Sequence, residues 1–360
     1  MKKIAIYTLQ EYNFGNRLQN YAVQEILAKE GFKTVSLPLM SYEEKKQHRV
    51  QRYPFLKHFD FFMHLLEKTE TIYRSYIKKD KIGNFKRFNR NINYALDGEY
   101  IGRNTMRFSP QKYYAILAGS DQIWNTNFPS CTINSFLPFD HDRKIAFSAS
   151  FGVDNIPFKK NISECLMNFK AISVREDAGK QIIKKLANRD ADVLIDPTLM
   201  INADEWRKIA HRPPKVGEHY ILTYFLSPKC DKAKDMFESI RKKRTIYEIM
   251  DSSNPVTKTA GPAEFLWLFD HADLVLTDSF HACVFSFLFN KPFVVYDRNW
   301  TEGNMNSRLE TLLGKFHLER KYAKSGLKND IWEHDYTDGY KQLELERQKA
   351  TEFLKKALDC

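Results

Sequence analysis

Cysteine is scarce in this sequence, and the five that occur show no pattern. They are odd in number, widely spaced and without a C-x-x-C pair. This excludes a disulfide framework and a zinc knuckle and fits a reducing compartment. Long apolar runs are also missing, because no stretch approaches the roughly 20 residues that cross a bilayer. The short apolar N-terminus is followed at once by polar residues, unlike a signal peptide. We therefore expect a cytoplasmic protein.

The motifs of several enzyme classes are absent as well. The sequence holds no G-x-S-x-G elbow, no Walker A loop and no G-x-G-x-x-G turn, so nothing supports a hydrolase, an NTPase or a dinucleotide cofactor. Asp190 and Asp192 precede a predicted strand and so lie at the wrong end of its sheet for a metal site. His281 and Cys283 are two apart on a predicted helix and diverge, which excludes a nucleophile–base pair. We expect neither a metal nor a resident cofactor.

Acidic residues are outnumbered, 45 against 56 basic ones, and the net charge is +11. Such an excess suits nucleic acid, an anionic membrane surface or anionic small molecules, and charge alone does not choose between them. Much of it falls within residues 41–112, interleaved with Tyr and Phe. We interpret that segment as a solvated helical face with buried aromatics. Peripheral contact with the inner face of an anionic membrane is the alternative, and nucleic acid is not expected.

Short apolar runs alternate with amphipathic stretches, which predicts βα units around parallel sheets. The expected strands of the first half are Ile4–Thr8, Thr34–Pro38, Tyr114–Ala118, Lys144–Ser148, Ala171–Val174 and Val193–Ile195. Those of the second half are Tyr220–Phe225, Thr245–Ile249, Leu274–Leu276 and Phe293–Tyr296, with helices over Asp231–Lys242, over Ala263–His271 and from Phe280.

At 360 residues the chain is long enough for two domains. A double proline, Pro213–Pro214, interrupts a helix and marks the boundary between them. We predict an N-terminal doubly wound domain over residues 1–212 with a basic helical insertion at about 41–112. A C-terminal doubly wound domain over 213–326 follows, and 327–360 packs back as an amphipathic helix. The predicted fold class is α/β, with two doubly wound domains.

Helix starts that follow strands are the candidate binding sites, because ligands of open α/β sheets bind beyond the carboxyl ends of the strands. The strongest candidate is the run from Thr277 to His281, directly after a predicted strand. Ser279 is a natural N-cap, and His281 falls in the first helical turn, where free N–H groups and the helix dipole favour an anion. The alternative, which the segment supports equally well, is that Asp278 and Ser279 only cap the helix and that His281 fills a crevice.

Four further polar clusters follow strands, and each has a structural alternative. Asn16, Arg17 and Asn20 stand at the first helix start, where polar residues are ordinary. Ser120, Asp121, Gln122 and Trp124 suit a sugar, or a turn with a buried Trp. Arg175 offers a cation to a ligand, or it pairs with a neighbouring carboxylate. Arg308, at the end of the cluster that starts at Asn304, offers another cation, or this cluster is only the start of a capped surface helix.

In content and order, five segments together resemble the polysaccharide pyruvyl transferase family. They are Gly15–Tyr21, Gly119–Asn125, Ser173–Glu176, Asp196–Leu199 and Thr277–His281. Gly261–Leu266 and Asn290–Phe293 also look like that family, so the match spans nearly the whole chain. One departure is that Ala282 and Cys283 follow His281 where the family usually has Gly and then Thr or Ser. This exchange bears on the width and the phosphate contacts of the donor pocket.

The resemblance implies a fold similar to GT-B glycosyltransferases, with two Rossmann-like domains, 1–212 and 213–326, facing across a cleft and the donor bound by the second. It also implies phosphoenolpyruvate as donor and co-substrate, and a saccharide or lipid-linked oligosaccharide as acceptor, in cell-envelope or exopolysaccharide synthesis. On this basis we expect His281 and Asp121 to be catalytic, with His281 supplying a proton and Asp121 orienting or deprotonating a sugar hydroxyl. The expected donor-binding residues are Arg17, Arg175, Ser279, His281 and Arg308. The expected acceptor-binding residues are Asn16, Asn20, Ser120, Asp121, Gln122 and Trp124.

Two other functions remain open. A nucleotide-sugar glycosyltransferase, such as a sialyltransferase-like enzyme, would use the same helix start for a nucleotide phosphate. A non-catalytic binder of nucleic acid or of an anionic surface would act through residues 41–112, but it leaves the polar clusters of both domains unexplained.

Overall fold

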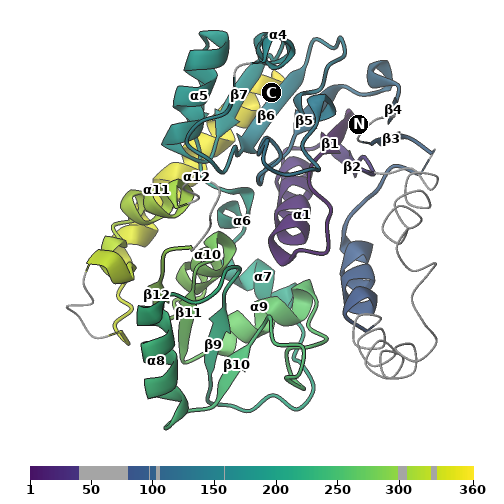
Figure 1. Ribbon diagram of the computed structural model, residues 1–360. Helices are drawn as coiled ribbons and strands as arrows, with labels where there is room; N and C mark the ends of the chain where they lie inside the picture. Colours follow the sequence, from purple (N-terminus) through teal and green to yellow (C-terminus); the bar gives the residue numbers. More distant parts are fainter. Residues whose placement is uncertain (40–79, 97, 103–105, 158, 299–305, 326–330) are drawn as a thin grey trace, which may run out of the picture.

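Two parallel β-sheets form the frame of the protein (Figure 1). The computed structural model describes residues 1–39, 80–96, 98–102, 106–157, 159–298, 306–325 and 331–360. In this part of the chain no helix is long and apolar enough to cross a membrane.

The first sheet has six strands in the order β2-β1-β5-β6-β7-β8, all parallel. They are β1 (Lys3–Tyr7), β2 (Lys33–Ser36), β5 (Ala115–Ala118), β6 (Lys144–Ala149), β7 (Ala171–Val174) and β8 (Asp192–Val193). The strands are apolar because both faces of the sheet are covered. α1 (Phe14–Lys29) and α12 (Thr337–Leu358) share a core with one face, whereas α4 (Lys160–Met167) and α5 (Asp177–Ala187) share a core with the other.

The second sheet is smaller and also parallel, with the order β10-β9-β11-β12. Its strands are β9 (Ile221–Tyr224), β10 (Ile246–Glu248), β11 (Leu274–Thr277) and β12 (Phe293–Val295). α8 (Asp231–Arg241) covers one face, and α9 (Pro262–His271) and α10 (Phe280–Leu288) cover the other. Both sheets are therefore doubly wound, which confirms the predicted fold class.

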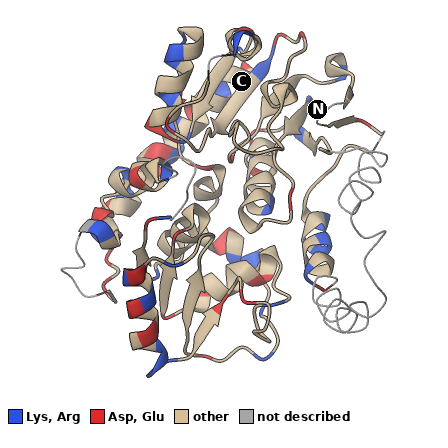
Figure 2. Cartoon of the chain, viewed as in Figure 1, with Lys and Arg blue, Asp and Glu red and all other residues tan. Residues whose placement is uncertain are grey.

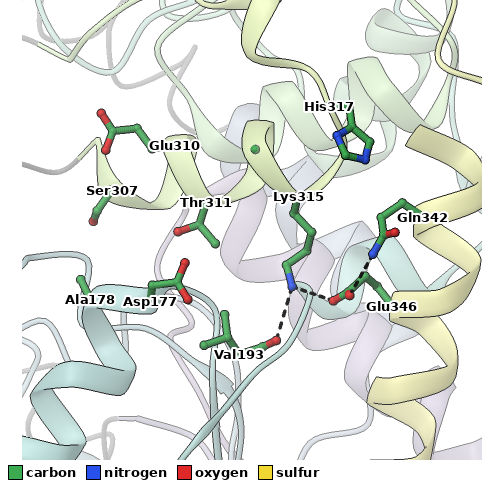
Figure 3. A pocket seen from close by; sticks show the side chains of 11 residues that line it. Asp177, Ala178, Val193, Ser307, Glu310, Thr311, Lys315, His317, Gln342 and Glu346 are labelled. Atoms are coloured by element: carbon green, nitrogen blue, oxygen red, sulfur yellow. Dashed lines mark hydrogen bonds and ion pairs between the residues drawn. The ribbon is translucent and has the colours of Figure 1, made fainter. Parts of the chain in front are cut away.

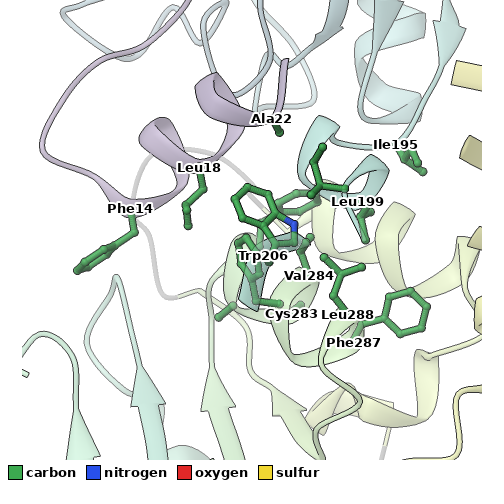
Figure 4. Close-up of a cluster of buried hydrophobic side chains, with 14 of the residues drawn as sticks. Phe14, Leu18, Ala22, Ile195, Leu199, Trp206, Cys283, Val284, Phe287 and Leu288 are labelled. Atoms are coloured by element: carbon green, nitrogen blue, oxygen red, sulfur yellow. The ribbon is translucent and has the colours of Figure 1, made fainter. Parts of the chain in front are cut away.

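An apolar cluster joins the two halves (Figure 4). Phe14, at the start of α1, stacks on Phe265 of α9 with ring centroids 4.7 Å apart. Trp206 is fully buried and packs edge-on against Phe285 of α10 at 5.2 Å. Two short helices between the sheets, α6 (Pro197–Met200) and α7 (Ala203–Ile209), contribute to this cluster. The two sheets thus share one continuous core.

The C-terminal helix α12 lies on the first sheet (Figure 1). Phe353 stacks on Phe147 of β6, and the Tyr114 hydroxyl donates to the carbonyl of Leu358 at 2.7 Å. α7, which precedes the predicted boundary at residue 212, packs on α9 of the second half. The domain limits themselves stay predictions.

Residues 40–79 of the predicted insertion lie outside the described residues. Of the rest, residues 80–88 are helical, and Figure 2 shows basic positions along this helix. Phe85 and Phe88 are buried, whereas Lys86, Arg87 and Arg90 are exposed. A wholly helical insertion is wrong, because an antiparallel hairpin follows. The remaining described elements are η2 (Asn89–Asn91), β3 (Tyr100–Ile101), β4 (Met106–Arg107), η3 (Pro110–Lys112), η4 (Ile133–Phe136), α11 (Ser307–Lys315), η5 (Glu319–Lys321) and η6 (Ala323–Ser325).

Candidate active site between the two sheets

The strand order places a binding crevice at the carboxyl edge of each sheet. In the first sheet the chain leaves β1 toward β2 on one side and β5 toward β6 on the other. In the second sheet the chain likewise leaves β9 toward β10 on one side and β11 toward β12 on the other. Such topological switch points are where open α/β sheets bind ligands.

One pocket of about 310 Å³ draws its walls from both crevices. Its first-sheet side comes from the β1–α1 loop, the start of α1 and the turn after β5. Its second-sheet side comes from the end of β9, the start of α10 and two arginines beyond β12. The lining residues are Leu9, Glu11, Asn13, Gly15, Asn16, Asp121, Gln122, Phe128, Pro129, Ser130, Tyr224, Leu226, Ser279, Phe280, His281, Arg298 and Arg308. The pocket is an interdomain site.

His281 stands in the first turn of α10, as predicted from the sequence. Its ring lies against the start of α1, where a Cβ on Gly15 would come within 2.2 Å of the His281 Nδ1 atom. Nε2 is buried without a hydrogen-bond partner, 3.7 Å from Asp196 Oδ2. Burial lowers the pKa of His281, and the neighbouring Asp196 and Asp121 oppose this. The lowered pKa favours the neutral form of His281.

Ser279 precedes α10 as its N-cap residue and lines the pocket. Its backbone N–H donates to Thr277 Oγ1 at 2.9 Å, and its side chain makes no capping hydrogen bond. Asp278 does not cap α10 either. Its carboxylate accepts from the backbone N–H groups of Leu226 and Ser227, at 2.7 and 2.9 Å, and so fixes the loop after β9. The start of α10 thus lines the pocket without a capping side chain, and helix starts of this kind bind anions.

Asp121 lines the pocket on the side of the first sheet. It has a positive φ of 68°, a conformation that is uncommon outside glycine and recurs at functional sites. Its carboxylate accepts from Asn16 Nδ2 at 2.5 Å and from Arg175 Nη2 at 3.1 Å. Burial alone would raise the pKa of Asp121, but Arg175, His281 and Arg308 together hold it well below its usual value. Asp121 is therefore a carboxylate that accepts hydrogen bonds and is a weak base.

Arg175 is not the free cation that donor binding requires. Its guanidinium is buried between two carboxylates, donating to Asp196 through Nη1 and to Asp121 through Nη2. It lies over the Phe280 ring, 4.7 Å from the centroid, and does not line the pocket. The sequence alternative, an arginine paired with neighbouring carboxylates, describes it correctly.

Arg308 does line the pocket, and no carboxylate pairs with it within the described part of the chain. Its Nε is buried without a partner. One end of the Gln122 amide lies 2.9 and 3.0 Å from its terminal nitrogens, so with its oxygen at that end Gln122 accepts from both. Burial, together with Arg175 and Arg298, lowers the pKa of Arg308 to about 9. The surroundings of Arg308 thus favour an anion. Asn304 and Met305, from the same sequence cluster, lie outside the described residues.

Two predicted site residues on α1 face elsewhere. Arg17 and Asn20 are buried but do not line the pocket. The Tyr12 ring lies 5.9 Å from the Arg17 guanidinium, and Asn20 accepts from Ser36 Oγ of β2 at 2.6 Å. Only Asn16 of this cluster reaches the pocket, because successive side chains on a helix point in different directions.

Ser120 and Trp124 also lie behind the pocket. Ser120 is fully buried and donates to Asp196 Oδ2 at 3.1 Å. Trp124 has no exposed surface. Its Nε1 donates to the carbonyl of Ser135 at 2.9 Å, and its ring stacks on Phe136. Trp124 therefore presents no face to a sugar, and the buried tryptophan of a turn is the interpretation that fits.

Two residues without a predicted role belong to the site. Arg298 lines the pocket three residues after β12 and donates to the carbonyl of Asp278 at 3.2 Å. The rule of strand carboxyl ends, applied to β12, would have indicated it. Asp196 is the N-cap of α6 and accepts from Ser120, Arg175 and Thr198. It lay in a quoted motif, yet only the tertiary structure brings it to His281.

The departure at residues 282 and 283 does not reach the pocket. Ala282 and Cys283 are buried in the shared apolar core. Neither residue lines the pocket.

A separate groove of about 680 Å³ lies between α5, α11 and α12 (Figure 3). Its lysine, Lys315, donates to Glu346 at 2.7 Å and contacts the carbonyl of Val193 at 3.5 Å. Asp177 and Glu310 also line this groove. With its cation paired and acidic residues around it, this groove is unsuited to an anionic donor. No group of three potential metal ligands occurs in the described residues.

The sequence profile of the polysaccharide pyruvyl transferases matches residues 13–299. The chain belongs to the polysaccharide pyruvyl transferase family. It is accordingly a transferase, and the profile of this family covers most of the pocket, including the starts of α1 and α10. A search of curated proteins found no significant match.

Solved structures with a related overall arrangement have very different sequences. A putative UDP-N-acetylglucosamine 2-epimerase from Listeria monocytogenes is 11% identical, with a TM-score of 0.43 and coverage of 96% of this chain and 94% of that one. MnaA from S. aureus, solved with UDP, is 10% identical, with a TM-score of 0.40 and 94% of each chain covered. The spinosyn rhamnosyltransferase SpnG is 8% identical, with a TM-score of 0.42 and both chains fully covered. Likenesses this distant carry no argument about the activity of this pyruvyl transferase family member.

Proposed function

We propose that this enzyme transfers the enolpyruvyl-derived group of phosphoenolpyruvate to a saccharide, forming a pyruvate ketal in cell-surface polysaccharide synthesis. The observation that carries the proposal is the set of cationic and N–H donors in the interdomain pocket. Within the described residues Arg308 lacks a carboxylate partner, and Arg298, whose Nε lies 4.0 Å from Asp278 Oδ2, lines the same pocket. The first turn of α10 lines it as well. A donor with both a phosphate and a carboxylate needs at least two such clamps.

The size of the pocket also favours a small donor. Its volume of about 310 Å³ is at the lower end of the range, about 300–1,000 Å³, in which drug-sized ligands bind. Phosphoenolpyruvate is a three-carbon acid with one phosphate, whereas a nucleotide sugar adds a base, a ribose, a second phosphate and a hexose. The small volume supports pyruvyl transfer over the nucleotide-sugar alternative.

In the proposed reaction His281 is the residue that protonates the donor. An anionic donor supplies the counter-charge that protonated His281 needs, since a nearby negative charge favours the charged form of an imidazole. Protonated His281 then gives its proton to the methylene carbon of the donor, and the former enol carbon becomes cationic. An acceptor hydroxyl adds to that carbon and gives its proton to His281, which is neutral after the first step. A second acceptor hydroxyl displaces phosphate, which leaves with the C–O electron pair and takes up the proton of that hydroxyl, and the cyclic ketal forms.

Asp121 has the properties of an orienting group in this scheme. Its low pKa makes it a poor acceptor of a full proton, but its carboxylate is fixed by Asn16 and Arg175 at the pocket wall. We propose that it holds an acceptor hydroxyl and that Asn16 and Gln122 complete the acceptor contacts. Arg308, Arg298, His281 and Ser279 hold the donor.

Thermal unfolding with and without millimolar phosphoenolpyruvate, nucleotide sugars and free nucleotides tests this proposal. A ligand that binds only the native state stabilises it, by about 2.7 kcal/mol at 100 times its Kd. We expect stabilisation by phosphoenolpyruvate, absent in His281→Ala and Arg308→Met. Stabilisation only by nucleotides would make the enzyme a nucleotide-sugar glycosyltransferase instead.

A further inference from the structure

A second group of buried donors lies beside the interdomain pocket, on the other side of the β1–α1 loop. Arg17 is 95% buried, and its Nε and Nη1 atoms have no hydrogen-bond partner. Within the described part of the chain no carboxylate lies within ion-pair distance of it. Burial lowers the pKa of Arg17, and Tyr94, Tyr12 and Glu11 offset this only in part. Among the described residues this buried cation is therefore not paired with a carboxylate, which is costly unless an anion binds there.

Two further unpartnered donors are close to Arg17. Asn20 lies three residues further along α1, on the adjoining part of the helix surface, and its Nδ2 is buried without a partner. The Tyr94 hydroxyl is also buried without a partner, and Tyr94 interacts electrostatically with Arg17. Ser36 connects these two residues, because it pairs with Tyr94 through a backbone bridge and donates to Asn20.

These donors suit a phosphate group better than a carboxylate. Two guanidinium nitrogens, an amide nitrogen and a hydroxyl supply four donor groups from two segments of the chain. Both oxygens of a carboxylate lie in one plane, whereas the oxygens of a phosphate group point in several directions and can accept from donors on both segments. The β1–α1 loop separates this cluster from the donor pocket. Glu11 and Asn13 line that pocket, while the Tyr12 ring lies 5.9 Å from the Arg17 guanidinium.

We propose that Arg17, Asn20 and Tyr94 form a second anion site that receives a phosphate group carried by the saccharide acceptor. The assignment to the acceptor rests on the proposed function, because Arg298, Arg308 and His281 already account for the donor anions. A phosphorylated acceptor held here would enter the interdomain pocket past the β1–α1 loop. Arg17 would then distinguish phosphate-linked acceptors from neutral sugars.

The test counts binding sites for inorganic pyrophosphate by equilibrium dialysis of the full chain. We expect the wild type to bind two equivalents, Arg17→Met one, Arg308→Met one and the double variant none. Arg87→Met, which removes an exposed arginine from the same half of the molecule, should still bind two. A folded Arg17→Met protein that binds two, or a wild type that binds one equivalent lost in Arg308→Met, overturns the proposal.

If Arg17→Met does not fold, two less disruptive variants test whether the second anion site exists. Tyr94→Phe removes one hydroxyl and should weaken the second site about tenfold, because a hydrogen bond to a charged group is lost. Asn20→Asp supplies an internal carboxylate to Arg17 and should abolish the second equivalent while raising Tm in phosphate-free buffer. Unchanged binding in both variants overturns the proposal.

Direct titration with phosphoenolpyruvate separates this site from the proposed function. Arg17→Met should keep the wild-type Kd for phosphoenolpyruvate within about twofold, since the variant leaves the donor pocket intact. Failure of phosphoenolpyruvate to bind any variant would refute the proposed donor. The pyrophosphate count would still decide whether Arg17 has a site of its own. A sugar 1-phosphate that competes only for the Arg17 site supports a phosphorylated acceptor, and competition by inorganic phosphate alone contradicts it.

Discussion

Charge compensation separates the site residues into two kinds. Arg175 is held between Asp121 and Asp196, so its charge is already used inside the protein. Arg308 and His281 line the pocket and carry buried nitrogens that lack hydrogen-bond partners. The first kind shapes the site, and the second kind is available to a ligand.

Replacing His281 by Ala should abolish transfer while the protein stays folded. Removing a positioned proton donor typically costs 10²- to 10⁴-fold in rate, and here the substitution also removes an anion contact. The measurement is phosphate release with donor and acceptor, alongside the circular dichroism of both proteins. Turnover near that of the wild type would refute the role of His281.

Donor affinity should fall as the pH rises through about 9. The pKa of Arg308 is lowered to about 9, so its guanidinium is charged below that pH and increasingly neutral above it. A neutral Arg308 cannot pair with an anion, and the Kd for phosphoenolpyruvate should rise at alkaline pH. Titrations between pH 7 and 10.5 measure this. In Arg308→Met binding should be weak throughout, and a wild-type Kd that stays flat across this range would contradict the assignment.

Asp196→Asn should destabilise the fold by about 3–5 kcal/mol, because it leaves a buried arginine half compensated. Asp196 is fully buried and accepts from Arg175, Ser120 and Thr198. Chemical denaturation gives the free energy of unfolding. The matched control is Asp190→Asn, an exposed carboxylate in the same stretch, which should change stability by less than about 0.5 kcal/mol. Equal effects of the two substitutions would contradict a structural role for Asp196.

At the scale of elements, the starts of α1 and α10 meet across the pocket. Because Gly15 has no Cβ, the His281 ring can lie directly on the backbone of α1. In the same way the N-cap of α6 brings Asp196 beside that ring. Three helix starts from different parts of the chain thus fix one imidazole.

Gly15→Ala should lower kcat at least tenfold without unfolding the protein. The new methyl group would lie 2.2 Å from His281 Nδ1, so the ring has to move from the position that the two aspartates define. Steady-state kinetics at saturating donor measures the effect. Gly83→Ala is the control, since a Cβ there meets no atom within 4 Å, and it should keep wild-type kcat. Identical kinetics in the two variants would show that the contact does not matter.

For the whole molecule, the decisive property is that one pocket has walls from both sheets. Phe14 on Phe265 and Trp206 on Phe285 hold the two halves together behind it. A ligand in this pocket therefore contacts both halves at once.

Donor binding should slow amide hydrogen exchange in both halves together. We expect protection of residues 14–17 in α1 and of 280–283 in α10 on adding phosphoenolpyruvate, because both helix starts contribute to the pocket. Hydrogen exchange followed by mass spectrometry measures it. The exposed helix α8 serves as internal control and should exchange at the same rate with and without donor. Protection confined to one half would contradict an interdomain site.

Much of the fold was predictable because local signals are strong here. Ala171–Val174 was predicted with its observed limits, and the other strands were found to within a few residues. Short apolar runs bounded by turn residues are typical of strands that are buried on both faces of a parallel sheet. Residues 100–107 were predicted wrongly as part of a helical insertion, because each strand of that hairpin has only two residues and leaves almost no periodic pattern.

The sequence predicted those residues of the candidate site whose position follows directly from the ends of strands. The residues placed directly at a helix start or a strand end, Asn16, Asp121, Ser279 and His281, do line the pocket. Arg17, Asn20 and Trp124 stand in the same motifs but face other parts of the protein, because the direction of a side chain depends on what packs around its element. Arg175 pairs with two carboxylates, Asp121 and Asp196, that come from separate segments of the chain. No local sequence pattern reveals such a pairing.

The sequence by itself determined the α/β class, the two parallel sheets and the family, since these follow from local periodicity and from the order of motifs along the chain. Only the tertiary structure decided which polar groups are compensated. Pairing depends on distances between segments far apart in the sequence, as between Arg175 and Asp196 or between Gly15 and His281. For that reason the tertiary structure alone separates the cations that hold the protein together from those left for its ligands.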